Sequence, residues 1–234
     1  LFGITASAVA TPATICAGQS TVLSATFNTA LATYDSPSVG APTSDEDLGN
    51  VTISQAGNIL LNNSTTINSL TGTLGTAVGT AGSFSNFTDL ATVNMAAGQT
   101  YDFSISSITT LTPYTNSLAI FIDWNRNGLF TDAGEMVYTP PATISGPHTR
   151  TGSFTVPAWA FGKMRMRVVC LETLITGYGT TSSYGEREDY MLNVVGATTW
   201  YQGATVIATT ATVGQTPATT TDYYATVCAQ GCQT

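Results

Sequence analysis

Short runs in which apolar and polar residues alternate are the feature that most constrains this chain. Residues 21–27 read Thr-Val-Leu-Ser-Ala-Thr-Phe, and residues 164–168 read Met-Arg-Met-Arg-Val. Alternation with a period of two places successive side chains on opposite faces of a β-strand. Turn-forming residues such as Pro12, Gly203 and Gly214 separate the runs. The pattern predicts an all-β chain of many short strands.

The composition agrees with this fold class and excludes two kinds of partner. Charged residues make up 9% of the 234 residues, against roughly 25% in an ordinary soluble domain. Six basic and 14 acidic side chains give a formal net charge of −8, and Lys163 is the one lysine. We therefore expect no nucleic-acid binding, which needs a surplus of basic residues. No apolar run approaches the roughly 20 residues of a membrane-spanning helix, so we also expect no membrane insertion.

A surface rich in hydroxyl groups and four cysteines favour an oxidising, extracellular location. The first residues lack a basic segment followed by an apolar stretch, so we expect no signal peptide within the given sequence. The prediction is a secreted or cell-surface protein.

The two ends of the chain carry similar strand patterns. Residues 7–27 predict two strands joined by a tight turn, and short strand-like runs resume at Ala197. Each block has about 40 residues, which is too few to bury a core alone. We therefore predict that residues 1–43 and 197–234 form one split β-sandwich. The domain between them, residues 44–196, is then an insertion in a loop, where long insertions cost little.

The two end blocks resemble the halves of an immunoglobulin-like module of large secreted bacterial proteins. The resemblance rests on residues 10–20, on Trp200-Tyr201 and on residues 219–232. It implies a disulfide between Cys16 and Cys232, leaving Cys170 and Cys228 either bonded or free. Four cysteines allow three connectivities, and the spacing alone does not choose among them.

The central region resembles the GEVED domain over about residues 44–196. The matching pieces occur in order at 45–53, 84–90, 97–101, 120–135 and 164–168, followed by Gly-Glu-Arg-Glu-Asp-Tyr at 185–190. The resemblance implies a second β-sandwich, of the non-catalytic accessory or repeat type found in secreted and surface proteins, often cargo of the type IX secretion route. Arg187 replaces the small apolar residue usual in the family, and we expect it at a solvent-facing strand position.

The stretch from Asp123 onward supports two interpretations. Oxygen-bearing side chains at Asp123, Asn125 and Asn127, followed by Gly128, match the first half of a calcium-binding loop. Asp132 or Glu135 would complete a structural Ca²⁺ site, although the twelfth position of the loop is glycine. Alternatively, Asn127-Gly128 forms the turn of a hairpin whose incoming strand contains Ile120, Ile122 and Trp124.

The acidic residues of the 185–190 motif also support two interpretations. Paired carboxylates can act as general acid and base. We favour a structural role, in which one face of the strand pairs with Arg165 or Arg167 of a neighbouring strand. In that arrangement Met164, Met166 and Val168 point inward, and Lys163, Arg165 and Arg167 point outward.

We predict that the chain has no enzymatic activity and no catalytic residues. The single histidine, His148, lies in a loop, and the sequence has no G-x-S-x-G nucleophile motif. Two cysteines, Cys228 and Cys232, are too few to hold zinc without further ligands.

The favoured function is a structural or adhesive unit of a bacterial cell-surface adhesin or self-assembling filament. An N-terminal segment containing Leu1, Phe2 and Ile4 could add a strand to the open edge of the next copy, so the expected partner is a second copy or another surface protein. The alternative is a carbohydrate-binding accessory module of a secreted enzyme, with a glycan as its partner. Its candidate stacking residues are Trp124, Trp159, Trp200, Tyr114, Tyr178 and Tyr184.

Overall fold

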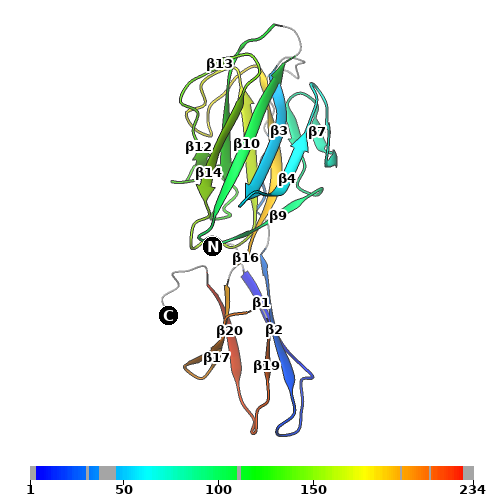
Figure 1. Ribbon diagram of the computed structural model, residues 1–234, viewed down its shortest axis with the longest axis vertical. Helices are drawn as coiled ribbons and strands as arrows, with labels where there is room; N and C mark the ends of the chain where they lie inside the picture. The colour runs from blue at the N-terminus through cyan, green and yellow to red at the C-terminus, as the bar shows by residue number, and fades with distance from the viewer. Residues whose placement is uncertain are drawn as a thin grey trace.

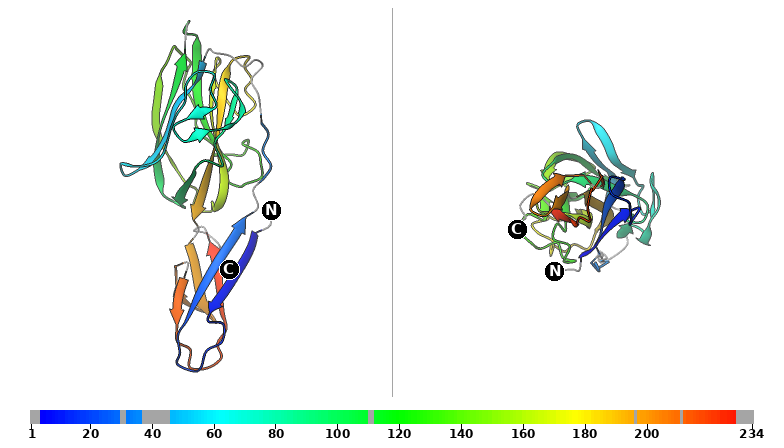
Figure 2. Two further views of the ribbon diagram at one scale, coloured as in Figure 1. Left: turned by 90° about the vertical axis from the view of Figure 1, so that its right-hand side faces the viewer. Right: turned by 90° about the horizontal axis from the view of Figure 1, so that it is seen from below.

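The computed structural model describes residues 4–29, 32–36, 46–109, 112–195, 197–210 and 212–228, which form strands and turns without a helix. Two β-sheet bodies lie end to end along the long axis, as Figure 1 and the left view of Figure 2 both show. The all-β prediction is therefore confirmed. Among the described residues no helix is long and apolar enough to span a membrane.

One sheet of the larger body contains four antiparallel strands in the order β14 (Thr149–Thr155), β10 (Thr100–Thr109), β3 (Glu46–Gln55) and β4 (Asn58–Ser64). Tyr101, Phe103 and Ile105 of β10 are buried, whereas Asp102 between them is exposed. Period-two alternation thus turns one face of this sheet inward.

The opposing sheet has six strands along its main path. They follow the order β12 (Met136–Tyr138), β11 (Thr115–Ile122), β15 (Gly162–Leu171), β16 (Gly185–Val195), β8 (Phe84–Asn86) and β7 (Val78–Thr80). β13 (Ile144–Ser145) also pairs with β11, and β9 (Thr92–Ala96) runs parallel to β16, as β8 does. β5 (Thr71–Gly72) and β6 (Gly75–Thr76) form a separate short hairpin.

The core of the larger body lies between these two sheets. The three side chains predicted to point inward, Met164, Met166 and Val168, are part of it. Ile120, Ile122 and Trp124, which were predicted to lead into the loop that follows, are part of it too. A second apolar cluster, which includes Phe121, Phe130, Val169 and Leu171, forms on the opposite face of β11 and β15. This face of the sheet is therefore covered by protein, which determines the environment of the arginines described below.

The smaller body consists of two three-stranded sheets. One has the order β1 (Ile4–Thr11), β2 (Thr21–Thr29) and β19 (Thr212–Gln215), and the other has the order β18 (Thr205–Ala208), β17 (Ala197–Gln202) and β20 (Tyr223–Cys228). Leu23 of the first sheet and Trp200 of the second are buried.

Strands from the two ends of the chain meet in the smaller body. β19 pairs with β2 in antiparallel register, with Leu23 opposite Val213. The larger body therefore lies between two segments that share a sheet. After β2, the chain leaves the smaller body through residues 32–36, which contact the covered face of the larger body.

Candidate functional site

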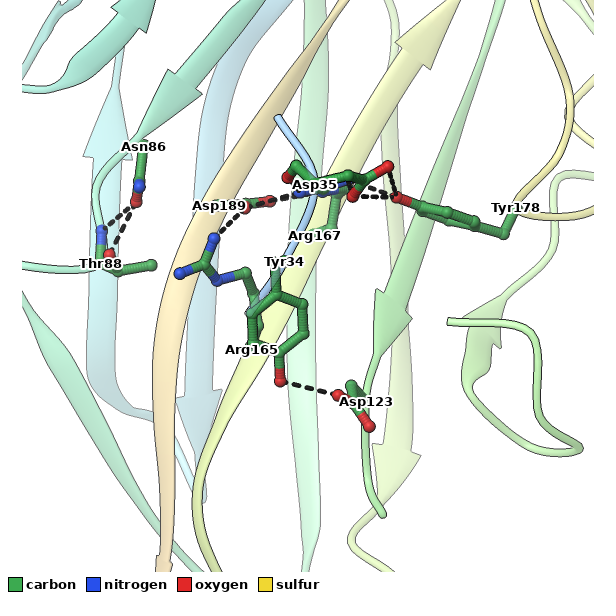
Figure 3. A network of polar contacts seen from close by, with 9 residues as sticks. All are labelled: Tyr34, Asp35, Asn86, Thr88, Asp123, Arg165, Arg167, Tyr178 and Asp189. Atoms are coloured by element: carbon green, nitrogen blue, oxygen red, sulfur yellow. Dashed lines mark hydrogen bonds and ion pairs between the residues drawn. The ribbon is translucent and has the colours of Figure 1, made fainter. Parts of the chain in front are cut away.

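The loop between β11 and β12 is organised around the buried carboxylate of Asp123. The backbone N–H of Asn127 donates to Asp123 Oδ1 over 3.1 Å, and that of Gly128 donates to Oδ2 over 2.8 Å. The hydroxyl of Tyr34, from the 32–36 segment, also donates to Oδ2 over 2.7 Å (Figure 3). Burial, followed by the contact with Asp123, raises the pKa of Tyr34 above its ordinary range.

The side chains of Asn125 and Asn127 converge on Asp132 in the same loop. Their Nδ2 atoms lie 2.8 and 2.7 Å from Asp132 Oδ2. Their carbonyl oxygens accept backbone N–H groups, from Asn127 to Asn125 Oδ1 and from Leu129 to Asn127 Oδ1. The polar groups thus stabilise a tightly curled loop.

Glu135 closes the loop from its C-terminal side. It is 1% exposed, its Oε2 accepts the backbone N–H of Asp132, and its Oε1 has no hydrogen-bond partner. Burial, together with the charges of Asp123 and Asp132, raises the pKa of Glu135 to about 7.

The structure therefore brings all five predicted calcium ligands into one network: Asp123, Asn125, Asn127, Asp132 and Glu135. Within the described ranges, no three His, Cys, Asp or Glu side chains are grouped so that they could hold a metal ion. Calcium binding by this loop therefore stays a prediction. The hairpin interpretation agrees with the antiparallel pairing of β11 and β12, but the connection is the whole 123–135 loop and not a two-residue turn.

Beside this loop, Asp189 of β16 binds two arginines of β15. Arg165 Nη1 lies 2.8 Å from Asp189 Oδ2, while Arg167 donates through Nε over 2.6 Å and through Nη2 over 2.8 Å. Arg167 also contacts Asp35 at 2.8 Å, and the Tyr178 hydroxyl donates to the same carboxylate (Figure 3). The expected pairing between the two strands is thus present at Asp189.

The expectation that Arg167 and Arg187 face solvent is wrong. Arg167 has a fully buried side chain, and Arg187 is 7% exposed. Residues 32–36 and the loop that carries Tyr178 cover this face of the sheet. Burial alone would lower the pKa of Arg167, but the hydrogen bonds and charge of Asp189 raise it above its ordinary value.

Glu186 and Glu188 point to the opposite face of β16 and are buried. Glu186 accepts the backbone N–H of Leu48 over 3.1 Å and the hydroxyl of Ser85 over 2.7 Å, and Glu188 accepts the Tyr190 hydroxyl over 2.6 Å. Burial, supported by Glu188 and then Asp47, raises the pKa of Glu186, and burial raises that of Glu188 to about 7.

This second acidic group was not predicted. Glu46 and Asp47 of β3 are also buried, and Asp47 acts electrostatically on both glutamates. The available signal was the acidic run at 45–47, because acidic side chains stand out in a chain with so few charges. With their carboxylates sealed from solvent, Glu186 and Glu188 are not placed to exchange protons with a bound substrate.

The single histidine is engaged with buried polar groups. His148 Nδ1 lies 3.2 Å from Ser107 Oγ and 3.1 Å from Gly146 O, and its Nε2 has no hydrogen-bond partner. Ser107 is buried, so its hydroxyl is not presented to a substrate.

The structure describes two cysteines as free thiols. Cys16 is exposed, and Cys170 lies in the core of the larger body, where burial raises its thiol pKa well above the ordinary value. Cys232 lies outside the described residues, as do Leu1 and Phe2, so the pairing of Cys16 with Cys232 stays a prediction. Cys228 is the last residue of β20.

The aromatic residues proposed to stack on a glycan differ in their solvent exposure. Trp124 and Trp200 are buried, which removes them from any surface platform. Trp159, Tyr114 and Tyr184 are exposed, and Tyr178 packs against Phe121 and Phe130.

The architecture is that of a β-sandwich module in which several ionic groups are buried. Residues 117–193, from β11 through most of β16, match the family model of the GEVED domain. The match confirms the predicted GEVED resemblance over these residues; it does not extend to the rest of the predicted 44–196 region or to the immunoglobulin-like module. No curated protein matches the chain.

Among solved structures, the chain is similar to an AA10 lytic polysaccharide monooxygenase (LPMO) from Streptomyces lividans. The identity is 18%, the TM-score is 0.25, and the match covers 54% of this chain and 66% of that one. A similarity this low does not establish a shared fold.

Proposed function

We propose that the chain is a non-catalytic structural module of a secreted cell-surface protein, acting as a unit of an adhesin or filament through self-association. The GEVED domain supports an extracellular β module of this kind. The sealed positions of Glu186, Glu188 and Ser107 argue for structural rather than catalytic roles.

The observation that carries self-association is the edge of the smaller body formed by β1. β1 ends its three-stranded sheet, and its sequence Ile-Thr-Ala-Ser-Ala-Val-Ala-Thr contains no charged residue. Proteins usually protect such edges with lysine, proline or a bulge, because the free N–H and C=O groups of an edge strand pair readily with another chain. β1 has no charge of its own to prevent that pairing.

A hollow next to β1 gives an incoming strand a place to pack. A cavity of about 420 Å³ lies between the start of β2, the 12–17 turn and residues 217–223, and a second of about 210 Å³ reaches Leu23 and Trp200. Ala8 and Ala10 line the β1 side of the second cavity, where their short side chains leave room for an incoming side chain. The occupant we propose is an edge strand of a second copy. Ile4 pairs with Thr29 within its own chain, so it belongs to the accepting edge.

Electron microscopy and light scattering of the purified full chain test the proposal. We expect filaments or oligomers for the natural chain and monomers for Ala8→Lys, which places a charge in the hollow. Val206→Lys, at an exposed position on β18 in the other sheet, is the matched control and should assemble normally. A natural chain that stays monomeric at high concentration, or an Ala8→Lys variant that assembles unchanged, would contradict it.

A further inference from the structure

We propose that the 123–135 loop binds one calcium ion and that Tyr34 closes the site, so that the ion fixes the 32–36 segment against the larger body. The loop already has the curl that such a site needs. Gly128 has a φ of +87° and Arg126 a φ of +61°, which turn the chain so that Asn127 and Gly128 donate to Asp123. In calcium loops, side-chain oxygens from alternate positions face inward in the same way.

The asparagine oxygens have capacity left for a cation. Asn125 Oδ1 and Asn127 Oδ1 each accept one backbone N–H, and an amide oxygen has two lone pairs. Asp132 is held beside them by two N–H donors. A cation that takes Asp132 as a ligand replaces those donors and draws the three side chains together.

Glu135 supplies an observation that the internal hydrogen bonds of the loop do not explain. Its carboxylate is almost completely buried, yet Oε1 has no hydrogen-bond partner. The group lies near enough to Asp123 and Asp132 to interact electrostatically with both. Leaving a buried carboxylate oxygen unsatisfied is unfavourable. A calcium ion, which prefers carboxylate oxygens, would satisfy it.

The charges of the loop also suit a divalent cation. Asp123, Asp132 and Glu135 are acidic, and Arg126 is the basic residue within the loop. The guanidinium of Arg126 lies over the ring of Phe161, 5.2 Å from its centroid. Three carboxylates and one guanidinium have a formal sum of −2, which matches the ion in magnitude.

Tyr34 connects this site to the 32–36 segment. Its hydroxyl binds Asp123, and its ring lies under the Arg165 guanidinium, 4.4 Å from the centroid. A Cβ added to Gly128 would lie 2.7 Å from the carbonyl oxygen of Thr33, so the segment lies directly against the loop. Because this segment follows β2 of the smaller body, an ion that rigidifies the loop also holds the chain between the two bodies.

Calorimetric titration of the chelator-treated full chain with Ca²⁺ tests the site. We expect one ion per chain with a dissociation constant of about 10⁻⁴–10⁻³ M, the range of extracellular modules. Asp132→Asn should weaken binding at least about tenfold, since each ligand charge tunes affinity. Asp102→Asn removes an exposed carboxylate from β10 and should leave binding unchanged.

Hydrogen exchange of a peptide covering residues 32–36 tests the coupling. Ca²⁺ should slow exchange there in the natural chain but much less in Asp132→Asn and in Tyr34→Phe. No heat of binding at millimolar Ca²⁺, or undiminished binding in Asp132→Asn, would overturn the site. Binding that leaves exchange in this peptide unchanged would overturn the role of Tyr34.

Discussion

Asp189 and Arg167 lie directly opposite each other on β16 and β15, and two hydrogen bonds of 2.6 and 2.8 Å join their fully buried side chains. A buried ion pair stabilises little relative to apolar residues, but removing one partner leaves the other charge uncompensated. Arg167 has a second carboxylate partner, Asp35, whose side chain is 54% exposed. The two contacts should therefore differ strongly in energy.

Asp189→Asn should destabilise the chain by about 3–5 kcal/mol, because it leaves Arg167 buried with only a partly exposed counter-charge. Denaturant unfolding at neutral pH measures this. Asp89→Asn, at an exposed position, is the matched control and should change the free energy of unfolding by less than about 0.5 kcal/mol. Equal effects of the two substitutions would show that the Asp189 contact is not important for stability.

Asp35→Asn should cost only about 1 kcal/mol or less, because solvent screens this side of the contact. Its effect should instead be local: the 32–36 segment should exchange its amide hydrogens faster while the core strands keep their protection. Hydrogen exchange resolved by mass spectrometry distinguishes the two regions. A loss of protection throughout β15 and β16 would contradict this assignment.

The alternation of residues predicted the inward side chains at 164–168, because a strand in a sandwich has one face toward the core. It did not predict the burial of Arg167. Alternation assigns a residue to a face but does not say what covers that face. The covering groups, Asp35 and Tyr178, come from a distant segment and from a loop.

The burial of Glu186 and Glu188 was missed for a different reason. Unpaired carboxylates are rarely placed in a protein interior, and the sequence indicated only that one face of this strand pairs with Arg165 or Arg167. Their hydrogen bonds come from Leu48, Ser85 and Tyr190, and a donor as far along the chain as Leu48 is not predictable from the 185–190 motif.

These two glutamates predict a pH dependence of stability. Burial raises the pKa of Glu188 to about 7 and also raises that of Glu186, so the folded chain binds more protons than the unfolded chain between pH about 4.5 and 7. Their contribution to stability is complete below pH about 4.5 and is lost as the pH rises through 7. Glu188→Gln should therefore raise the melting temperature more at pH 8 than at pH 5.

Differential scanning calorimetry from pH 4 to 9 provides this measurement. Glu172→Gln, which changes a less buried glutamate after β15, is the control for a general change in net charge. An equal gain from Glu188→Gln at both pH values would mean that Glu188 is ionised in the folded chain throughout.

Gly185, the first residue of the 185–190 motif, should tolerate no side chain. Its φ is +121°, and a Cβ there would lie 2.1 Å from the carbonyl oxygen of Cys170 on the neighbouring strand β15. The backbone conformation alone costs a residue with a side chain of order 1–3 kcal/mol, and the clash with β15 adds to it. Gly185→Ala should therefore lower the denaturation midpoint markedly, whereas Gly177→Ala, where a Cβ meets nothing within 4 Å, should leave it unchanged or slightly raised. If the two variants unfold at the same denaturant concentration, close approach of β15 and β16 is not the reason for glycine at this position.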